Sequence, residues 1–179
     1  MASPQPARAF AAGKRATPSQ LLYVSDATTG YVDVFELPTG KLVQVITGLG
    51  QPYGECVDAS GNVYVADIRQ SVVGEYAHGG KYPIKVLNDN GYNPVDCSVD
   101  PTTGNLAVTN SNSAQDGAGD VAIFVKARRV PGHFRDRSIA AYEYCSYDGK
   151  GNFSWMGGSK PMETLHSPSS RPARRPLSE

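Results

Sequence analysis

Short apolar runs separated by turn-forming residues dominate the chain between residues 21 and 158. Within these runs, apolar and polar side chains alternate with a period of two, or the run is apolar throughout. The spacing of an amphipathic helix is not sustained anywhere. Residues 56–67, CVDASGNVYVAD, place two such runs around the turn-forming residues DASGN. This stretch predicts a β-hairpin, and the chain as a whole predicts an all-β fold.

The hairpin recurs along the chain. CSVDPTTGNLAVTN begins at Cys97, CSYDGKGNFSWM begins at Cys145 with a weaker second half, and LYVSD at Leu22 matches the second half alone. A third strand and an outer strand follow in each of the first three units. The outer strands read LVQVI, PIKVL and, less regularly, HFRDRSI. Four short strands in a unit of about 42 residues are typical of a β-propeller blade.

The number of units limits the architecture. The first unit lacks its inner strand, the second and third are complete, and the fourth breaks off after YEYCSYDGKGN. We therefore predict an incomplete β-propeller, with about three four-stranded antiparallel blades in an open arc over residues 21–158. Residues 1–20, rich in Ala and Pro, predict a flexible linker. Residues 159–179, rich in Pro, Ser and Arg, predict a disordered tail.

Residues 52–67 follow the pattern P-x-G-x-x-V-D-x-x-G-N-x-Y-V-A-D, and residues 94–110 follow it more loosely. This pattern resembles that of the NHL-like and gluconolactonase-like six-bladed β-propellers, over about residues 21–157. The resemblance implies a blade scaffold without specifying its function. It also implies that blades are missing, so the chain is either a truncated propeller or a half-propeller that dimerises to complete the ring.

Charge and hydropathy exclude some classes of partner. Residues 21–158 carry ten basic and fifteen acidic residues, and an acidic body argues against nucleic acid as a partner. No apolar run approaches the roughly 18 residues needed to cross a bilayer. The first 20 residues contain no continuous apolar core of a secretory signal. An extracytoplasmic or envelope location is therefore implied by the resemblance alone.

The three cysteines lie in the first strands of the repeated hairpins. Their number is odd and no CxxC spacing occurs, so buried free thiols are favoured and one disulfide is the alternative. Cys97 and Cys145 each precede the aspartate that opens the turn by three residues, whereas Cys56 precedes it by two. Cys56 is therefore expected on the opposite face of its strand, which argues against a shared metal site.

Ligand-binding residues of propellers are expected on the loops that join outer to inner strands and second to third strands. The candidates on or beside these loops are Tyr53, Glu55, Arg69, Tyr92 and Asp96. In the gluconolactonase group the resemblance implies a divalent metal held by Glu, Asn and Asp, one of them from a P-D-G step. Tyr53 and Val95 occupy the matching steps here, so only Glu55 and Asp96 remain as carboxylates near the channel. No catalytic residue is predicted.

Residues 110–120, NSNSAQDGAGD, offer oxygen ligands for a divalent cation such as calcium. These are Asn110, Asn112, Asp116 and Asp120. The spacing does not follow DxDxDG, and a plain turn is the alternative. The histidines His78 and His133 are expected in a turn and a loop, with no nucleophile motif near them. Asp26 and Asp67, which end their strands, are expected to accept hydrogen bonds from the next loop.

These observations together favour a non-enzymatic propeller module that binds an unidentified protein or small molecule, or else a truncated propeller fragment. A second copy of the chain that completes the ring is a further expected partner. The alternative is a metal-dependent lactonase or esterase of the gluconolactonase type, with Glu55 and Asp96 as residual ligands.

Overall fold

The computed structural model describes residues 20–128 and 130–159. The predicted linker and tail lie outside this range, apart from one residue of each. The described residues form thirteen strands and one short 3-10 helix, and they contain no α-helix. The prediction of an all-β fold is therefore confirmed for this part of the chain.

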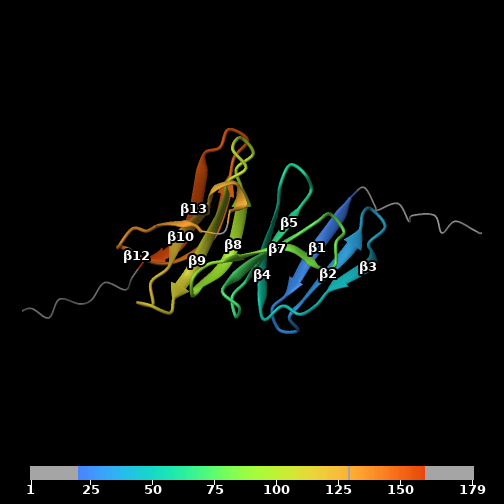
Figure 1. The fold of residues 1–179 in the computed structure, drawn as a ribbon, viewed down its shortest axis with the longest axis horizontal. Helices are drawn as coiled ribbons and strands as arrows, with labels where there is room; N and C mark the ends of the chain where they lie inside the picture. Colours follow the sequence, from blue (N-terminus) through green and yellow to red (C-terminus); the bar gives the residue numbers. More distant parts are fainter. Residues whose placement is uncertain (1–19, 129, 160–179) are drawn as a thin grey trace, which may run out of the picture.

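The strands form four separate antiparallel sheets, which we number in chain order (Figure 1). Sheet 1 contains β1 (Leu21–Asp26), β2 (Tyr31–Glu36) and β3 (Lys41–Ile46). Sheet 2 contains β4 (Pro52–Val57), β5 (Val63–Asp67), β6 (Val72–Tyr76) and β7 (Pro83–Asn88). Sheet 3 contains β8 (Tyr92–Val99), β9 (Leu106–Ser113), β10 (Asp120–Phe124) and β11 (Gly132–Phe134), with the helix η1 (Val125–Ala127) between the last two. Sheet 4 contains β12 (Ile139–Tyr147) and β13 (Phe153–Ser159).

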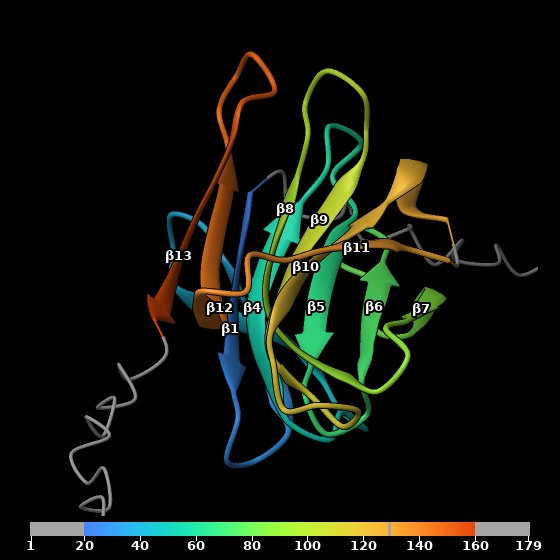
Figure 2. The same cartoon turned by 90° about the vertical axis from the view of Figure 1, so that its left-hand side faces the viewer.

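Each sheet is built from strands that follow one another in sequence, so the repeat units of the sequence correspond to the sheets. The strand numbers of three, four and four match the prediction for the first three units. The fourth unit extends further than predicted, because β13 forms a strand from the sequence FSWMGGS. Glycine and serine are poor strand formers by composition, but pairing of β13 with β12 holds the segment extended (Figure 2).

Three apolar cores lie between consecutive sheets. The core between sheets 1 and 2 contains Val32, Val34, Ile46, Val63, Val65 and Tyr76. The core between sheets 2 and 3 contains Tyr64, Val73, Leu87, Cys97, Leu106, Val108, Ala122 and Phe124, together with Ala127 of η1. The core between sheets 3 and 4 is built around Ala107, Val121 and Tyr142.

Strand β5 shows why the run VYVA is apolar at every position. Val63 and Val65 point into the core with sheet 1, whereas Tyr64 points into the core with sheet 3. Successive side chains of a strand lie on opposite faces, so a strand covered on both faces needs apolar residues throughout. Burial of these faces is the main favourable contribution to the fold.

Two of the repeated hairpin turns, those at Asp58 and Asp148, share one hydrogen-bonding scheme. The Asp58 carboxylate accepts the N–H groups of Ser60 and Asn62 at 2.8 and 2.9 Å. The Asp148 carboxylate accepts the equivalent groups of Lys150 and Asn152 at the same distances. Gly61 adopts a φ of +84°, a conformation that favours glycine, which explains the Gly-Asn pair at the end of the turn.

The cysteine prediction is wrong for two of the three residues. Cys56 and Cys97 form a disulfide between β4 and β8, with their Cα atoms 5.6 Å apart, and Cys145 is free. The one-residue offset of Cys56 places it on the face of sheet 2 that looks toward sheet 3, and Cys97 looks back. The one-residue offset of Cys56 was interpreted above as evidence against a shared metal site. It is instead what lets the two cysteines face each other between the stacked sheets and form a bond.

Candidate functional site

The loops predicted to carry ligand-binding residues do meet at one end of the molecule. The N–H groups of Gly50 and Gln51, in the connection from sheet 1 to sheet 2, donate to the Asp67 carboxylate at 2.6 and 2.9 Å. The N–H of Asp89, in the connection from sheet 2 to sheet 3, donates to the carbonyl of Ser71 at 3.0 Å. Each outer-to-inner connection is thus tied to a second-to-third-strand loop.

Asp26 and Asp67 have the structural role that was predicted for them. Asp26 accepts the N–H groups of Thr28 and Thr29 at 2.8 and 3.2 Å, and these bonds lower its pKa. Asp67 is fully buried and accepts a third N–H from Gln70, at 3.2 Å. Both carboxylates therefore hold loops and are not free to bind a ligand.

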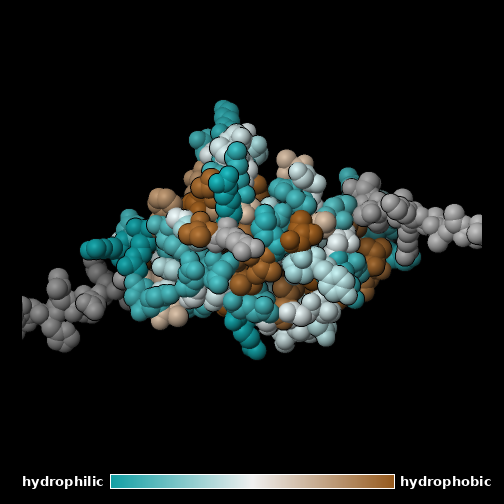
Figure 3. All heavy atoms as spheres, in the orientation of Figure 1, coloured by the Kyte–Doolittle hydropathy of each residue, from teal (hydrophilic) through white to brown (hydrophobic). Residues whose placement is uncertain are grey.

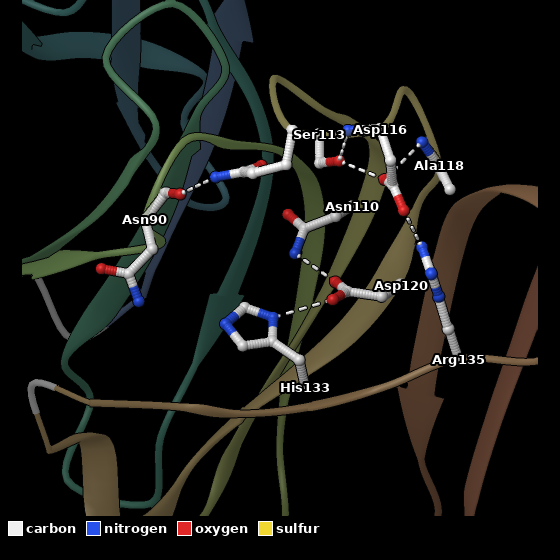
Figure 4. A network of polar contacts seen from close by, with 9 residues as sticks. Asn90, Asn110, Ser113, Asp116, Ala118, Asp120, His133 and Arg135 are labelled. Atoms are coloured by element: carbon white, nitrogen blue, oxygen red, sulfur yellow. Dashed lines mark hydrogen bonds and ion pairs between the residues drawn. The ribbon is translucent and has the colours of Figure 1, made fainter.

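The most polar part of this end lies in sheet 3, around Asp120 (Figure 4). Asp120 is 1 % exposed, accepts the side-chain amide N–H of Asn110 at 2.8 Å and lies 2.8 Å from Nδ1 of His133. The His133 ring stacks on Tyr92, with ring centroids 4.5 Å apart and an interplanar angle of 21°. Burial raises the pKa of Tyr92, and the negative charge of Asp120 adds to this effect.

Two sequence predictions meet in this cluster, and one residue was misplaced. Tyr92 and the pair Asn110 and Asp120 come from separate predictions, and the structure brings them together. His133 was expected in a loop, but it lies in β11 and pairs with Ala122 of β10. The irregular sequence of the outer strand gave only a weak indication of its position.

Asp116 belongs to a second network at the edge of the same loop (Figure 4). Its carboxylate accepts hydrogen bonds from Ser113 at 2.7 Å and from the Ala118 N–H at 3.1 Å. It also forms an ion pair with Arg135 at 2.5 Å, and the bond from Arg135 holds its pKa well below the ordinary range. Asn112 is exposed. The predicted oxygen ligands of residues 110–120 are therefore divided between separate networks.

Asp89 is a functional candidate that the sequence did not reveal. Its side chain is fully buried, and neither carboxylate oxygen has a hydrogen-bond partner. Burial raises its pKa to about 7, with a further contribution from the charge of Asp120, and the Asn110 amide opposes this shift. Asp89 precedes Pro94 by five residues, and the equivalent residue before Pro52 is Thr47. This departure from the repeat was the available signal, hidden within the turn-like sequence NDNG.

The remaining predicted residues lie on the inner strands or on an exposed loop. Glu55 of β4 is half-buried, and its pKa is raised by burial and, more weakly, by the charge of Asp96 on β8. The Asp96 carboxylate accepts the N–H of Cys145 at 2.9 Å, and burial raises its pKa. The main-chain carbonyl of Tyr53 accepts the Ser25 hydroxyl. Arg69 is exposed in the loop after β5.

The free thiol among the described residues is not activated as a nucleophile. Across residues 20–128 and 130–159, no three or more His, Cys, Asp or Glu side chains are arranged to hold a metal ion. The free thiol of Cys145 has its pKa raised to about 12 by burial and by the charge of Asp96. A thiol with so high a pKa is a poor nucleophile near neutral pH, because the thiolate is the reactive form.

Comparison with known proteins leaves the family open. No protein-family model matches the chain, and no curated protein shows significant similarity to it. Within the described residues, the structure contains no helix with the length and apolar character that a membrane span requires.

Proposed function

We propose that this chain is a non-enzymatic interaction module of the NHL-like propeller type, and that it pairs with a second copy of itself. The sheets act as blades, and the partner covers the outward face of sheet 1, which consists of the side chains of β1 to β3 that point away from sheet 2. The observation that carries this proposal is the exposure, on that face, of apolar residues whose repeat equivalents are buried.

The repeat allows the exposure of this face to be compared with that of the equivalent face of sheet 2. Leu22 and Val24 precede the strand-ending Asp26 by four and two residues, and Val63 and Val65 stand in the same relation to Asp67. Val63 and Val65 are 3 % and 0 % exposed, whereas Leu22 and Val24 are 46 % and 45 % exposed. The sequence thus keeps apolar residues at positions that are buried only when another sheet packs against this face.

Neighbouring strands extend the same face. Leu22 pairs with Phe35 of β2, which in turn pairs with Leu42 of β3, and Tyr31 lies at the far end of β2. Leu42 and Tyr31 are 48 % and 45 % exposed. Figure 3 shows hydrophobic residues (brown) among more hydrophilic ones at the end of the molecule that sheet 1 forms. Completing the burial of each half-exposed side chain contributes about 1 kcal/mol, so the face can support association.

The opposite end of the stack offers a surface that this face can meet. Tyr144 and Met156 are direct cross-strand partners in sheet 4, and they are 58 % and 59 % exposed. Two copies related by a two-fold axis would stack sheet 1 of each on sheet 4 of the other. Two copies of four sheets give eight, two more than the six blades of the NHL-like propellers but within the range of about 4 to 8 blades found in closed propellers. Because each copy carries both surfaces, a second copy is the partner that we propose.

Light scattering of the full chain tests this function. The wild-type protein is expected to have twice the monomer mass, and Leu22→Asp is expected to convert it to a monomer, because an unpaired carboxylate would be buried at the interface. Ile84→Asp is the matched control, since Ile84 is 59 % exposed on the outer strand β7 and away from this face. A monomeric wild-type protein, or a dimer that survives Leu22→Asp, would contradict the proposal.

The disulfide supports an oxidising compartment for this module. Bonds such as Cys56–Cys97 form and persist in oxidising environments and are rare in reducing ones. We therefore propose an extracytoplasmic location, in agreement with the family resemblance. Alkylation of the unfolded but unreduced protein should leave Cys56 and Cys97 unlabelled in protein taken from its native host. Labelling of both residues would exclude that location.

No specific observation favours the metal-dependent lactonase. Of its residual ligands, Asp96 accepts the Cys145 N–H, and Ser25 lowers the pKa of Glu55, of which Oε1 is buried without a hydrogen-bond partner. We therefore retain the binding function alone.

A further inference from the structure

We infer that a calcium-class cation binds between the carboxylate of Asp89 and the side-chain oxygen of Asn110. Three oxygen atoms carry this inference: Oδ1 and Oδ2 of Asp89 and Oδ1 of Asn110 are all buried and have no hydrogen-bond partner. Both residues are 0 % exposed. Buried polar atoms are nearly always paired in native proteins, so three unpaired oxygens in adjoining side chains indicate a missing partner.

The orientation of Asn110 follows from its neighbour Asp120. The amide nitrogen of Asn110 donates to Asp120, which turns the amide oxygen away from that carboxylate. Figure 4 shows the amide nitrogen of Asn110 directed toward Asp120 and its oxygen directed away from Asp120. The Asn110 side chain lowers the pKa of the Asp89 carboxyl group, so the two side chains are neighbours.

The charges around the site show that Asp89 lacks a cationic partner. The side-chain ion pairs found in residues 20–128 and 130–159 join Glu75 to Lys85, His133 to Asp120, and Arg135 to Asp116. None of them includes Asp89. The basic groups of these pairs are engaged by other carboxylates, and a buried carboxylate without a partner is strongly unfavourable.

A cation satisfies this arrangement better than a proton or a water molecule. One proton on Asp89 can bridge to Asn110, but it leaves the second Asp89 oxygen unpaired. A water molecule can donate to two oxygens but leaves the charge of Asp89 uncompensated. A cation contacts all three oxygens and compensates the charge. Calcium accepts carboxylate and amide oxygens at flexible geometry, and water completes its coordination shell.

Two side-chain ligands place the site at the weak end of calcium affinities. Dissociation constants of about 10⁻⁴ to 10⁻³ M are typical of extracellular modules with few charged ligands. The proton competes with the cation for the same oxygens, so binding should weaken as the pH falls. The charged group that acts on Asp89 is Asp120 of β10, whose carboxylate lies 2.8 Å from Nδ1 of His133.

Thermal unfolding of the full chain at pH 8, after treatment with a chelator, tests the site. Calcium chloride at about 10 mM is expected to raise the melting temperature of the wild-type protein by about 3–10 °C. Sodium chloride at equal ionic strength is expected to have little effect. Asp89→Asn should abolish the calcium response, and Asp116→Asn, which changes a carboxylate of the neighbouring network, should retain it.

Isothermal titration with calcium chloride provides a readout that is independent of stability. Binding to the wild-type protein and to Asp116→Asn, without binding to Asp89→Asn, would support the inference. Absence of both heat and thermal shift in the wild-type protein would show that Asp89 is neutralised by a proton alone. An unchanged response in Asp89→Asn would place the cation elsewhere. Either result would overturn the inference.

Discussion

The bond between Cys56 and Cys97 closes a loop between the inner strands of sheets 2 and 3, and its removal has a calculable effect. The two residues are 41 positions apart in sequence. In the loop-closure description, a cross-link of this span removes about 13 cal/mol/K of entropy from the unfolded chain. At 25 °C this corresponds to about 4 kcal/mol of stability. That amount is a large fraction of the 5–15 kcal/mol typical of whole domains.

Reduction isolates this effect better than substitution does. Cys97 is 4 % exposed and packs within the core between sheets 2 and 3, so replacing it would also change the packing. We therefore compare oxidised and reduced protein in a Cys145→Ala background, which removes the one free thiol of the described residues and prevents exchange.

Urea unfolding, followed by circular dichroism, measures the difference. With a denaturant slope of about 2 kcal/mol/M, the midpoint should fall by about 2 M on reduction, and the slope should stay similar. A difference in unfolding free energy below about 1 kcal/mol would refute the loop-closure reasoning. A reduced protein that does not fold at all would show that the cross-link contributes more than the entropy of one loop.

Two further predictions concern buried carboxylates. Asp67→Ala leaves the buried N–H groups that donate to Asp67 without an acceptor, and it should cost about 2–4 kcal/mol in urea unfolding. Asp26→Ala, at an exposed position, is the control and should cost clearly less. Equal losses would contradict the difference in role. In calcium-free buffer the raised pKa of Asp89, about 7 when folded against about 3.9 when unfolded, means that the folded state binds more protons between these values. The stability that Asp89 contributes is fully present below about pH 4 and is lost as the pH rises toward 7. The loss should reach about 4 kcal/mol relative to Asp89→Asn. Parallel pH profiles of the two proteins would disprove the raised pKa of Asp89.

The repeat made most of the architecture accessible from the sequence. Strand patterning and the recurrent turn aspartates located the first three sheets, because both signals are local and depend on few residues. The strand β13 was missed because its pairing with β12, and not its composition, keeps Gly157 and Gly158 extended. The irregular outer strand β11 gave only a weak signal for the same reason.

The candidate site was less accessible, because it depends on contacts between distant segments. Asn110 and Asp120 could be proposed from one loop, but His133 and Asp89 come from other strands and connections. The prediction for the cysteines failed for the same reason. Cys56 and Cys97 occupy different positions in their units, and only the stacking order of the sheets reveals that different positions face each other across an interface.

The stacking of neighbouring sheets is the central claim of this account. Cys56 and Ser98 each lie two residues before a turn aspartate, and Cys97 and Cys145 each lie three before. The Ser98 hydroxyl accepts the N–H of Tyr147 in sheet 4 at 2.9 Å, so Ser98 faces sheet 4 as Cys56 faces sheet 3.

Disulfide mapping of Ser98→Cys, by mass spectrometry after digestion without reduction, tests this stacking most directly. We expect two bonds, one between Cys56 and Cys97 and one between position 98 and Cys145. A free thiol at Cys145, or a bond between Cys56 and Cys145, would contradict the stacking of the sheets in sequence order.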